Sequence, residues 1–195
     1  MKKIVLIILI LAVIIFSGWN LFSKKNQRSE LEKIRLNYPS LELYVDGVIR
    51  SKTILEKDKD DIVAYNSLGL AWKSLADWSQ KEGVENYKDY YKEALEIYEA
   101  GIDKTFRKNT LFMTNAGNMA KYLEDYKLAE SYYEEAISVS PGDESYYVLL
   151  AELYEYNMNK SEEEIIAVYE AGKKRVLNPL FLEQRKRSFI NRFNN

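Results

Sequence analysis

The chain has 195 residues, about one domain by size, and its 28 basic and 30 acidic residues give a net charge of −2. It contains no cysteine and no histidine. This composition excludes disulfides and thiolate nucleophiles. It also removes the usual zinc ligands and the side chain that most often transfers protons near neutral pH. The balanced charge does not favour nucleic acid as a partner. We therefore expect no catalytic residues, no metal site and no cofactor.

Residues 1–23 form an apolar segment bounded by charge. Lys2 and Lys3 precede an uncharged run over residues 4–22, and Lys24 follows it closely. These 19 residues would make a helix about 28 Å long, close to the hydrocarbon thickness of a bilayer. We predict a transmembrane anchor that contacts the lipid bilayer through residues 4–22. A cleaved signal peptide is the alternative, but no convincing small-x-small cleavage site follows the apolar run.

The orientation of this anchor is predicted from its flanking charges. Basic residues lie on both sides, so the positive-inside comparison is nearly balanced. A very short tail with two lysines usually stays in the cytoplasm. This favours a single-pass protein of the cytoplasmic membrane, with the N-terminus inside and the rest of the chain outside. Without Lys2 and Lys3, 26 basic residues face 30 acidic ones, so the exported part would be mildly acidic.

The rest of the chain is predicted to be helical, after a polar linker at residues 24–40. Glycine and proline are scarce, at 8 and 3, and no segment alternates polar and apolar residues for long. Signals for helix starts occur at Asp125, at Asp143, at Ser161 with Glu164 in capping-box spacing, and at Asn178 before Pro179.

Two stretches of the chain resemble each other. "DYKLAESYYEEAISVSP" at 125–141 aligns with "YYKEALEIYEAGIDKTF" at 90–106, 35 residues earlier. Ala129 then falls on Ala94 and Tyr133 on Tyr98. Self-similarity at this period usually indicates stacked structural units.

The pattern extends upstream and downstream. Gly117 lies twelve residues before Ala129, Gly69 occupies the same place in the first copy, and "YVLLAELY" around Ala151 begins a third copy. The arrangement W-x₂-L-G-x₂-Y…A-x₃-F…P resembles the tetratricopeptide repeat (TPR) family. The resemblance covers roughly residues 60–178. It implies an all-α fold, in which about three helical hairpins stack as a solenoid and a C-terminal helix caps them.

This interpretation divides the chain into segments. They are the anchor at 1–23, the linker at 24–40, a degenerate half-repeat at 41–60, repeats at 61–108, 109–143 and 144–178, and a capping helix at 179–195. In the last helix we expect Leu182, Phe189 and Phe193 near the packed face, with Arg185, Lys186 and Arg187 mostly away from it.

The abundant tyrosines, 16 in number, fall mainly on repeat-defining positions. We therefore expect core packing for most of them, with a tyrosine-lined ligand surface as the alternative.

The first repeat is longer than the others. From Gly69 to Ala94 is 25 residues, against 12 from Gly117 to Ala129, so 13 extra residues enlarge its hairpin. Trp78 and Tyr87 lie there. These two aromatic residues could form a protruding partner-binding site, or their rings could pack against each other across the hairpin.

The first helices of the resembled family line a concave groove that takes peptides or protein segments. The matching positions here are Asn66, Leu70, Lys73, Thr114, Asn118, Lys121, Val148, Glu152 and Glu155. Some relatives hold a C-terminal carboxylate with lysine and asparagine at set positions. Asn115 alone matches that set, so the activity is not carried over. Glu152 and Glu155 could accept a basic segment, or all nine residues could simply be solvated.

The sequence therefore predicts a membrane-tethered scaffold for protein–protein interaction, or an assembly or chaperone-like accessory, whose partner is a protein or peptide. It predicts no enzyme. A passive spacer or oligomerisation module is one alternative. A carboxylate-dependent hydrolase of the envelope, using Glu152 and Glu155, is the other.

Overall fold

The structure is a computed structural model that describes residues 27–193. The predicted anchor at residues 4–22 lies outside this range. Among the described residues, no helix is both long and apolar enough to cross a membrane. The chain divides into two compact units, residues 1–46 and residues 47–195.

The described part of the first unit is helical. A helical segment covers residues 27–37, the short 3-10 helix η1 (Pro39–Leu41) follows, and α2 (Glu42–Lys57) begins in this unit and continues into the next. Arg35 donates a 2.7 Å hydrogen bond to Glu42 and lies 3.5 Å from Asp46. The segment that the sequence predicted as a polar linker thus contains a helix whose arginine contacts the start of α2.

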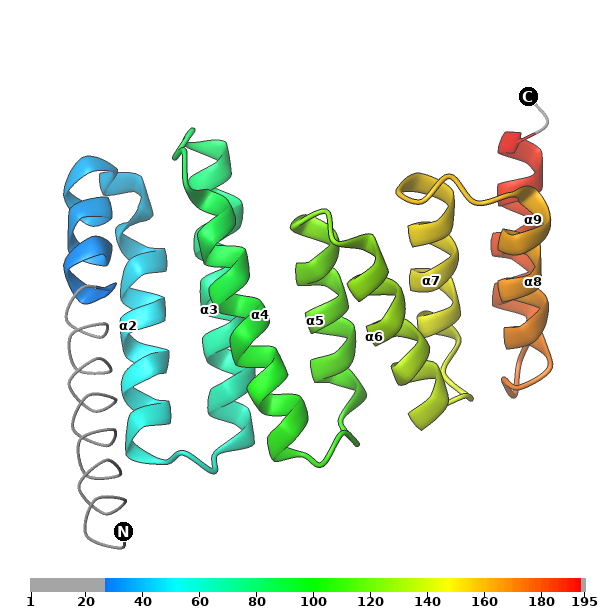
Figure 1. Cartoon of the computed structure of the whole chain (residues 1–195), viewed down its shortest axis with the longest axis horizontal. Helices are drawn as coiled ribbons and strands as arrows, with labels where there is room; N and C mark the ends of the chain where they lie inside the picture. Colours follow the sequence, from blue (N-terminus) through cyan, green and yellow to red (C-terminus); the bar gives the residue numbers. More distant parts are fainter. Residues whose placement is uncertain (1–26, 194–195) are drawn as a thin grey trace, which may run out of the picture. The chain divides into compact units, whose positions relative to one another are not determined.

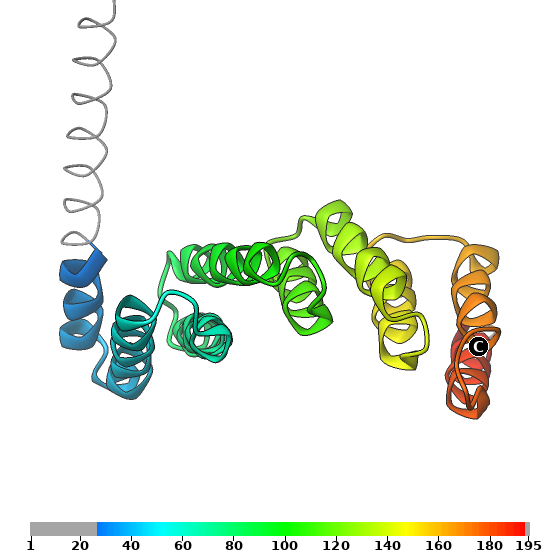
Figure 2. The same cartoon turned by 90° about the horizontal axis from the view of Figure 1, so that it is seen from below.

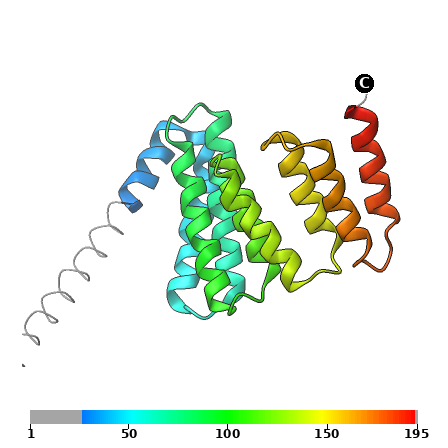
Figure 3. The same ribbon diagram turned by 45° about the vertical axis from the view of Figure 1, so that its right-hand side comes forward.

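The second unit consists of successive helix pairs. The pairs are α3 (Ile62–Lys81) with α4 (Tyr87–Lys104), α5 (Thr110–Tyr122) with α6 (Tyr126–Val139), and α7 (Glu144–Tyr156) with α8 (Glu162–Lys173), followed by α9 (Leu180–Phe193). The partners in each pair run antiparallel (Figures 1 and 3). The prediction of an all-helical chain is confirmed for the described residues.

Side-chain caps fix where these helices begin, because the first backbone N–H groups of a helix have no partner within it. Asp125 accepts a hydrogen bond from the backbone of Leu128 at 3.1 Å, and Asp143 accepts one from Ser145 at 3.0 Å. Ser161 and Glu164 form the predicted capping box. These sequence predictions are confirmed. At α9, Asn178 accepts from the backbone N–H of Leu180 at 3.1 Å, and the helix begins at Leu180.

The helices form two layers. The amide of Asn115 in α5 lies 3.4 Å from Asn66 in α3, and the hydroxyl of Tyr146 in α7 donates to Thr110 in α5 at 2.8 Å. The first helices of the pairs are therefore neighbours, and we call α3, α5, α7 and α9 the first-helix layer. In the other layer, Tyr132 of α6 donates a 2.5 Å hydrogen bond to Glu99 of α4.

Glycine allows the two layers to approach closely. A Cβ atom added at Gly69 would lie 2.5 Å from a ring carbon of Tyr98, and one added at Gly117 would lie 2.5 Å from a ring carbon of Tyr133. Both rings are buried, with 1% and 0% of their surface exposed. Burial raises the pKa of Tyr98 to about 12. These rings fill the core at the positions where the sequence predicted packing.

The C-terminal helix takes the place of a further first helix. Gly101 of α4 meets the ring of Phe112 in the following helix, and Gly172 of α8 meets Leu182 of α9 in the same way. Leu182 and Phe189 are buried, as predicted. α9 therefore continues the first-helix layer and covers the end of the last pair.

The prediction that the basic residues of α9 point mostly away from the packed face was wrong for two of them. Arg185 pairs with Glu152 of α7, and Lys186 lies 2.6 Å from Glu170 of α8. Arg187 does stay outside, with 73% of its side chain exposed. The long basic side chains reach past the apolar contact to carboxylates on neighbouring helices, which apolar periodicity alone does not reveal.

The 13 extra residues of the first pair lie at one end. α3 has 20 residues against 13 in α5, and α4 has 18 against 14 in α6. The remaining two residues lie in the connecting turn, which is longer than the turn after α5. Figure 1 shows that this hairpin reaches beyond its neighbour.

Candidate functional site

The nine predicted groove residues lie on α3, α5 and α7, three on each helix. On each helix they are spaced by four and then three residues, which places them on one side of it. We call the side of the first-helix layer formed by these residues the first-helix face.

Part of this face is joined by hydrogen bonds. Asn66 contacts Asn115 on the neighbouring helix. Asn118 accepts a 2.8 Å hydrogen bond from the buried Tyr133. Thr114 donates to the backbone carbonyl of Thr110 at 3.0 Å, within its own helix. Asn66 and Asn118 therefore orient other residues, and neither is a free polar group.

The two lysines of the face lie around one exposed ring. The Tyr122 ring, 40% exposed, lies 5.6 Å from the ammonium of Lys73 and 5.9 Å from that of Lys121. It also stacks on Tyr91 at 5.0 Å between ring centroids. Lys73 is paired with Asp77 at 2.5 Å.

Asp77 also accepts a 2.7 Å hydrogen bond from Tyr91. Burial and the Asp77 carboxylate together raise the pKa of the Tyr91 hydroxyl well above its usual range. The hydroxyl thus stays protonated and keeps donating, which fixes the stacked ring that supports Tyr122.

The acidic third of the face is already occupied from within the chain. Glu152 pairs with Arg185, and Glu155 accepts hydrogen bonds from Arg192 at 2.8 Å. Both arginines belong to α9. In this structure both carboxylates are paired with the chain's own C-terminal helix.

These ion pairs also bear on the hydrolase alternative. A pair of catalytic carboxylates needs an open space between them for the substrate. Glu152 and Glu155 instead each face a guanidinium. In the described part of the chain, no group of three or more acidic side chains is arranged to hold a metal ion.

Exposed apolar side chains on this face were not fully predicted. Leu70, 53% exposed, belongs to the predicted set. Val63 is 72% exposed, Leu111 51% and Tyr156 62%, and each lies one helical turn from a predicted residue on the same helix. The sequence signal was present, because Val63 and Leu111 stand three residues before Asn66 and Thr114. An apolar side chain in the first turn is, however, equally compatible with core packing.

The two aromatic residues of the long hairpin are placed differently from each other. Trp78 is 40% exposed, and the ammonium of Lys81 lies over its ring at 4.1 Å. Tyr87 is half-buried and meets Tyr91 edge-on at 6.2 Å between centroids. Trp78 is thus partly exposed and covered by Lys81 on one side, whereas Tyr87 supports the aromatic stack.

A hollow of about 550 Å³ lies away from the first-helix face. Its walls come from α6, α7 and α8 and include Ile137, Leu150 and Val168. Glu134, Glu164 and Arg175 are also among its lining residues. None of the nine predicted residues lines it, so sequence reasoning did not point to this hollow.

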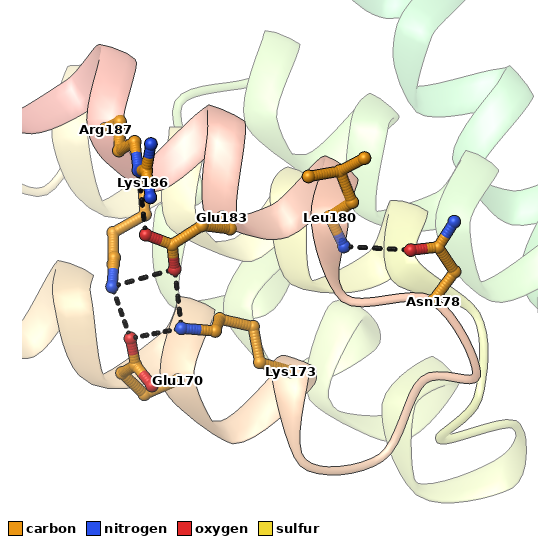
Figure 4. Close-up of polar contacts among 7 residues, drawn as sticks. All are labelled: Glu170, Lys173, Asn178, Leu180, Glu183, Lys186 and Arg187. Carbon is orange, nitrogen blue, oxygen red and sulfur yellow. Dashed lines mark hydrogen bonds and ion pairs between the residues drawn. The ribbon is translucent and has the colours of Figure 1, made fainter.

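The attachment of α9 is electrostatic as well as apolar. Lys173 of α8 lies 2.5 Å from Glu183 of α9 and 3.0 Å from Glu170 (Figure 4). Lys186 and Arg187 lie 3.0 Å from Glu183. Hydrogen bonds from these cations lower the pKa of Glu183 to about 2. The cluster holds α9 where its arginines reach the first-helix face.

Solved structures with the same arrangement of helices are known. TTC0263, a thermophilic TPR protein of Thermus thermophilus, is 20% identical, with a TM-score of 0.61 over 87% of this chain and 92% of that one. The MamA protein is 19% identical, with a TM-score of 0.54 over 80% of this chain and 76% of that one. The fold is that of TPR proteins. At this level of identity the likeness shows the fold alone. Comparisons with protein-family models and with curated proteins gave no match.

Proposed function

We propose that this TPR-fold chain is a membrane-tethered scaffold, or an assembly or chaperone-like accessory, that binds a segment of a partner protein on its first-helix face. The observation that carries the proposal is the group of exposed apolar side chains on this face: Val63, Leu70, Leu111, Tyr122 and Tyr156. Apolar surface gathered on one face is a common mark of a protein-interaction site.

The charges of the first-helix face indicate what kind of partner segment it could bind. Glu152 and Glu155 are neutralised by α9, and Lys73 is paired with Asp77, so the apolar surface of α3 and α5 beside Lys121 is the part of the face left for a partner. A segment with apolar side chains and some acidic groups fits this surface, since such a segment would bury Leu70 and Leu111 and lie near Lys121. The exposed Tyr122 ring offers the kind of anchor that often dominates interface energies.

The tether is the second part of the proposal. The apolar run at residues 4–22 supports an anchor in the cytoplasmic membrane, with the N-terminus inside and the TPR fold outside. A tethered domain meets membrane-bound partners at a raised effective concentration, so a modest intrinsic affinity is sufficient.

Site-specific photo-crosslinking in cells tests the interaction. The probe is placed at positions 70 and 111, whose side chains are exposed, and not at Asn118, because that residue holds Tyr133. Lys127 on α6, also exposed, is the control position. We expect a discrete protein product at 70 and 111 and none at 127.

A variant of the first-helix face then tests whether the crosslinked product depends on binding to its apolar side chains. Leu70→Glu with Leu111→Glu should abolish the product formed from a probe at Tyr122, while the melting temperature stays close to that of the parent. Lys127→Glu is the matched control and should leave the product unchanged. Products that are identical at positions 70, 111 and 127, or a product at position 122 that survives the double substitution, would favour the passive spacer.

A further inference from the structure

The turns after α4, α6 and α8 lie along one edge of the second unit, opposite the turns after α3, α5 and α7 (Figure 1). Figure 2 looks onto this edge from below. We call it the turn edge and define it by residues 105–109, 140–143 and 174–179. Two of its three turns carry protruding apolar side chains.

The first of these is Phe106, in the turn between α4 and α5. Its side chain is 85% exposed, and its backbone has φ 51°, followed by Arg107 with φ 54°. A bulky residue rarely adopts this left-handed conformation. The turn is nevertheless fixed, because the backbone of Arg107 donates to Ile102 at 2.9 Å and its guanidinium pairs with Glu135. An apolar ring is thus held outward in a strained turn with little cover from the chain.

The second group lies in and after the turn that leads into α9. Leu177 is 104% exposed, Leu180 59% and Phe181 42%. Asn178 fixes this turn by capping α9. As at Phe106, a turn with a fixed backbone holds apolar side chains exposed to solvent.

Charge accompanies both groups. Lys108 and Lys174 are exposed beside them. Three carboxylates near the same edge have partners: Asp60 is paired with Lys104 at 2.5 Å, Asp103 lies 3.8 Å from Arg107, and Asp143 caps α7. Glu144 lines the same hollow as Leu177. Exposed cations therefore lie next to the apolar side chains, and three of the neighbouring carboxylates are already paired or act as caps.

From these observations we propose that the turn edge binds the surface of a lipid bilayer that contains anionic lipids. Phe106 and the Leu177–Phe181 group would enter the boundary between headgroups and acyl chains, and Lys108 and Lys174 would meet the headgroup phosphates. Apolar residues combined with lysine are the usual composition of interfacial binding surfaces.

A bilayer fits these tips better than a protein does. The tips protrude from separate turns, whereas a specific protein interface needs about 1,000 Å² of complementary surface. A fluid bilayer accepts separate insertions without such complementarity. This inference goes beyond the proposed function, because it concerns a different surface and a different partner.

The test uses the full chain reconstituted in vesicles. The absence of cysteine allows one cysteine at a time to carry an environment-sensitive dye. The dye is placed at Phe106→Cys, at Leu177→Cys or, as the control, at Leu70→Cys on the first-helix face. The vesicles contain phosphatidylcholine alone or with phosphatidylglycerol, and spin labels on the acyl chains report contact with lipid by quenching.

We expect several-fold stronger quenching at 106 and 177 than at 70 in the anionic vesicles, and weaker quenching in high salt, which screens charge. Lys108→Glu with Lys174→Glu should reduce the quenching while thermal melting stays unchanged. Equal quenching at all three positions would overturn the proposal. A shift of dye emission at 106 and 177 without quenching by lipid would also overturn it, since it would indicate burial against protein.

Discussion

Arg192 of α9 and Glu155 of α7, 37 residues apart, form a two-pronged ion pair: one guanidinium nitrogen lies 2.8 Å from both carboxylate oxygens of Glu155. Glu155 has only 13% of its side chain exposed, and Arg192 has 51%. The pair ties the C-terminal helix to the first-helix face and neutralises one of the nine predicted groove residues.

We expect this pair to contribute modestly to stability, because the arginine is half exposed to water. A double-mutant cycle with Glu155→Gln and Arg192→Gln should give a coupling free energy of about 0.5–1 kcal/mol. Chemical denaturation measures it. The exposed pair of Lys92 with Asp89 on α4 provides the comparison and should give less. A coupling indistinguishable from zero would mean that α9 is held by its apolar contacts alone.

The glycine contacts predict opposite effects of one substitution at two sites. Gly117→Ala would place a methyl group 2.5 Å from the buried ring of Tyr133, so we expect the free energy of unfolding to fall by about 1–3 kcal/mol. Gly47→Ala in α2 meets nothing within 4 Å and should raise stability by about 0.5–1 kcal/mol, since alanine favours helix. Urea denaturation of both variants checks the contrast, and equal effects would contradict the close crossing.

Ala129 tests the register of the middle pair. It is fully buried, with 0% exposure. Ala129→Arg should abolish cooperative melting, because it overpacks a helix crossing and buries a charge. Ser131→Arg, on the exposed side of the same helix, is the control and should melt as the parent does. A cooperative transition near the parent temperature in Ala129→Arg would show that α6 packs in another register.

The cluster at α9 predicts a pH dependence of stability. The folded state lowers the pKa of Glu183 from 4.5 to about 2. The ionised carboxylate therefore stabilises the fold above pH 4.5, and this contribution is lost as the pH falls from 4.5 towards 2. We expect the melting temperature of Glu183→Gln to change less between pH 4.5 and pH 2 than that of the parent chain.

Glu96→Gln, at an exposed position on α4, is the control for this series. Its melting temperature should follow that of the parent. If Glu183→Gln also follows the parent, the ion cluster at α9 does not contribute to stability.

Much of the fold could be predicted because its signals are local. Helix caps act within three residues of the chain, and this is why Asp125, Asp143 and Ser161 mark real helix starts. The close crossing at Gly117 could be predicted, since the repeat places a small residue where the second helix of a pair crosses the first. Its contact with the ring of Tyr133 is known only from the structure. The candidate face came from the resemblance to the TPR family, whose first helices line a groove.

The sequence could not predict which charged residues of the first-helix face are already paired within the chain. The family resemblance placed Glu152 and Glu155 on the face but gave no sign that Arg185 and Arg192 neutralise them. These pairs depend on how Leu182 seats against Gly172, which sets the distance between α9 and its neighbours.

The sequence by itself thus determined the helices, their caps and the order of their packing, because each rests on contacts within a repeat or on its regular recurrence. Only the tertiary structure decided which charges of the first-helix face are occupied and which apolar side chains stay exposed. Phe106 illustrates the reason: its exposure follows from a left-handed turn fixed partly by a contact to Glu135 on the next hairpin, so it depends on residues brought together by folding.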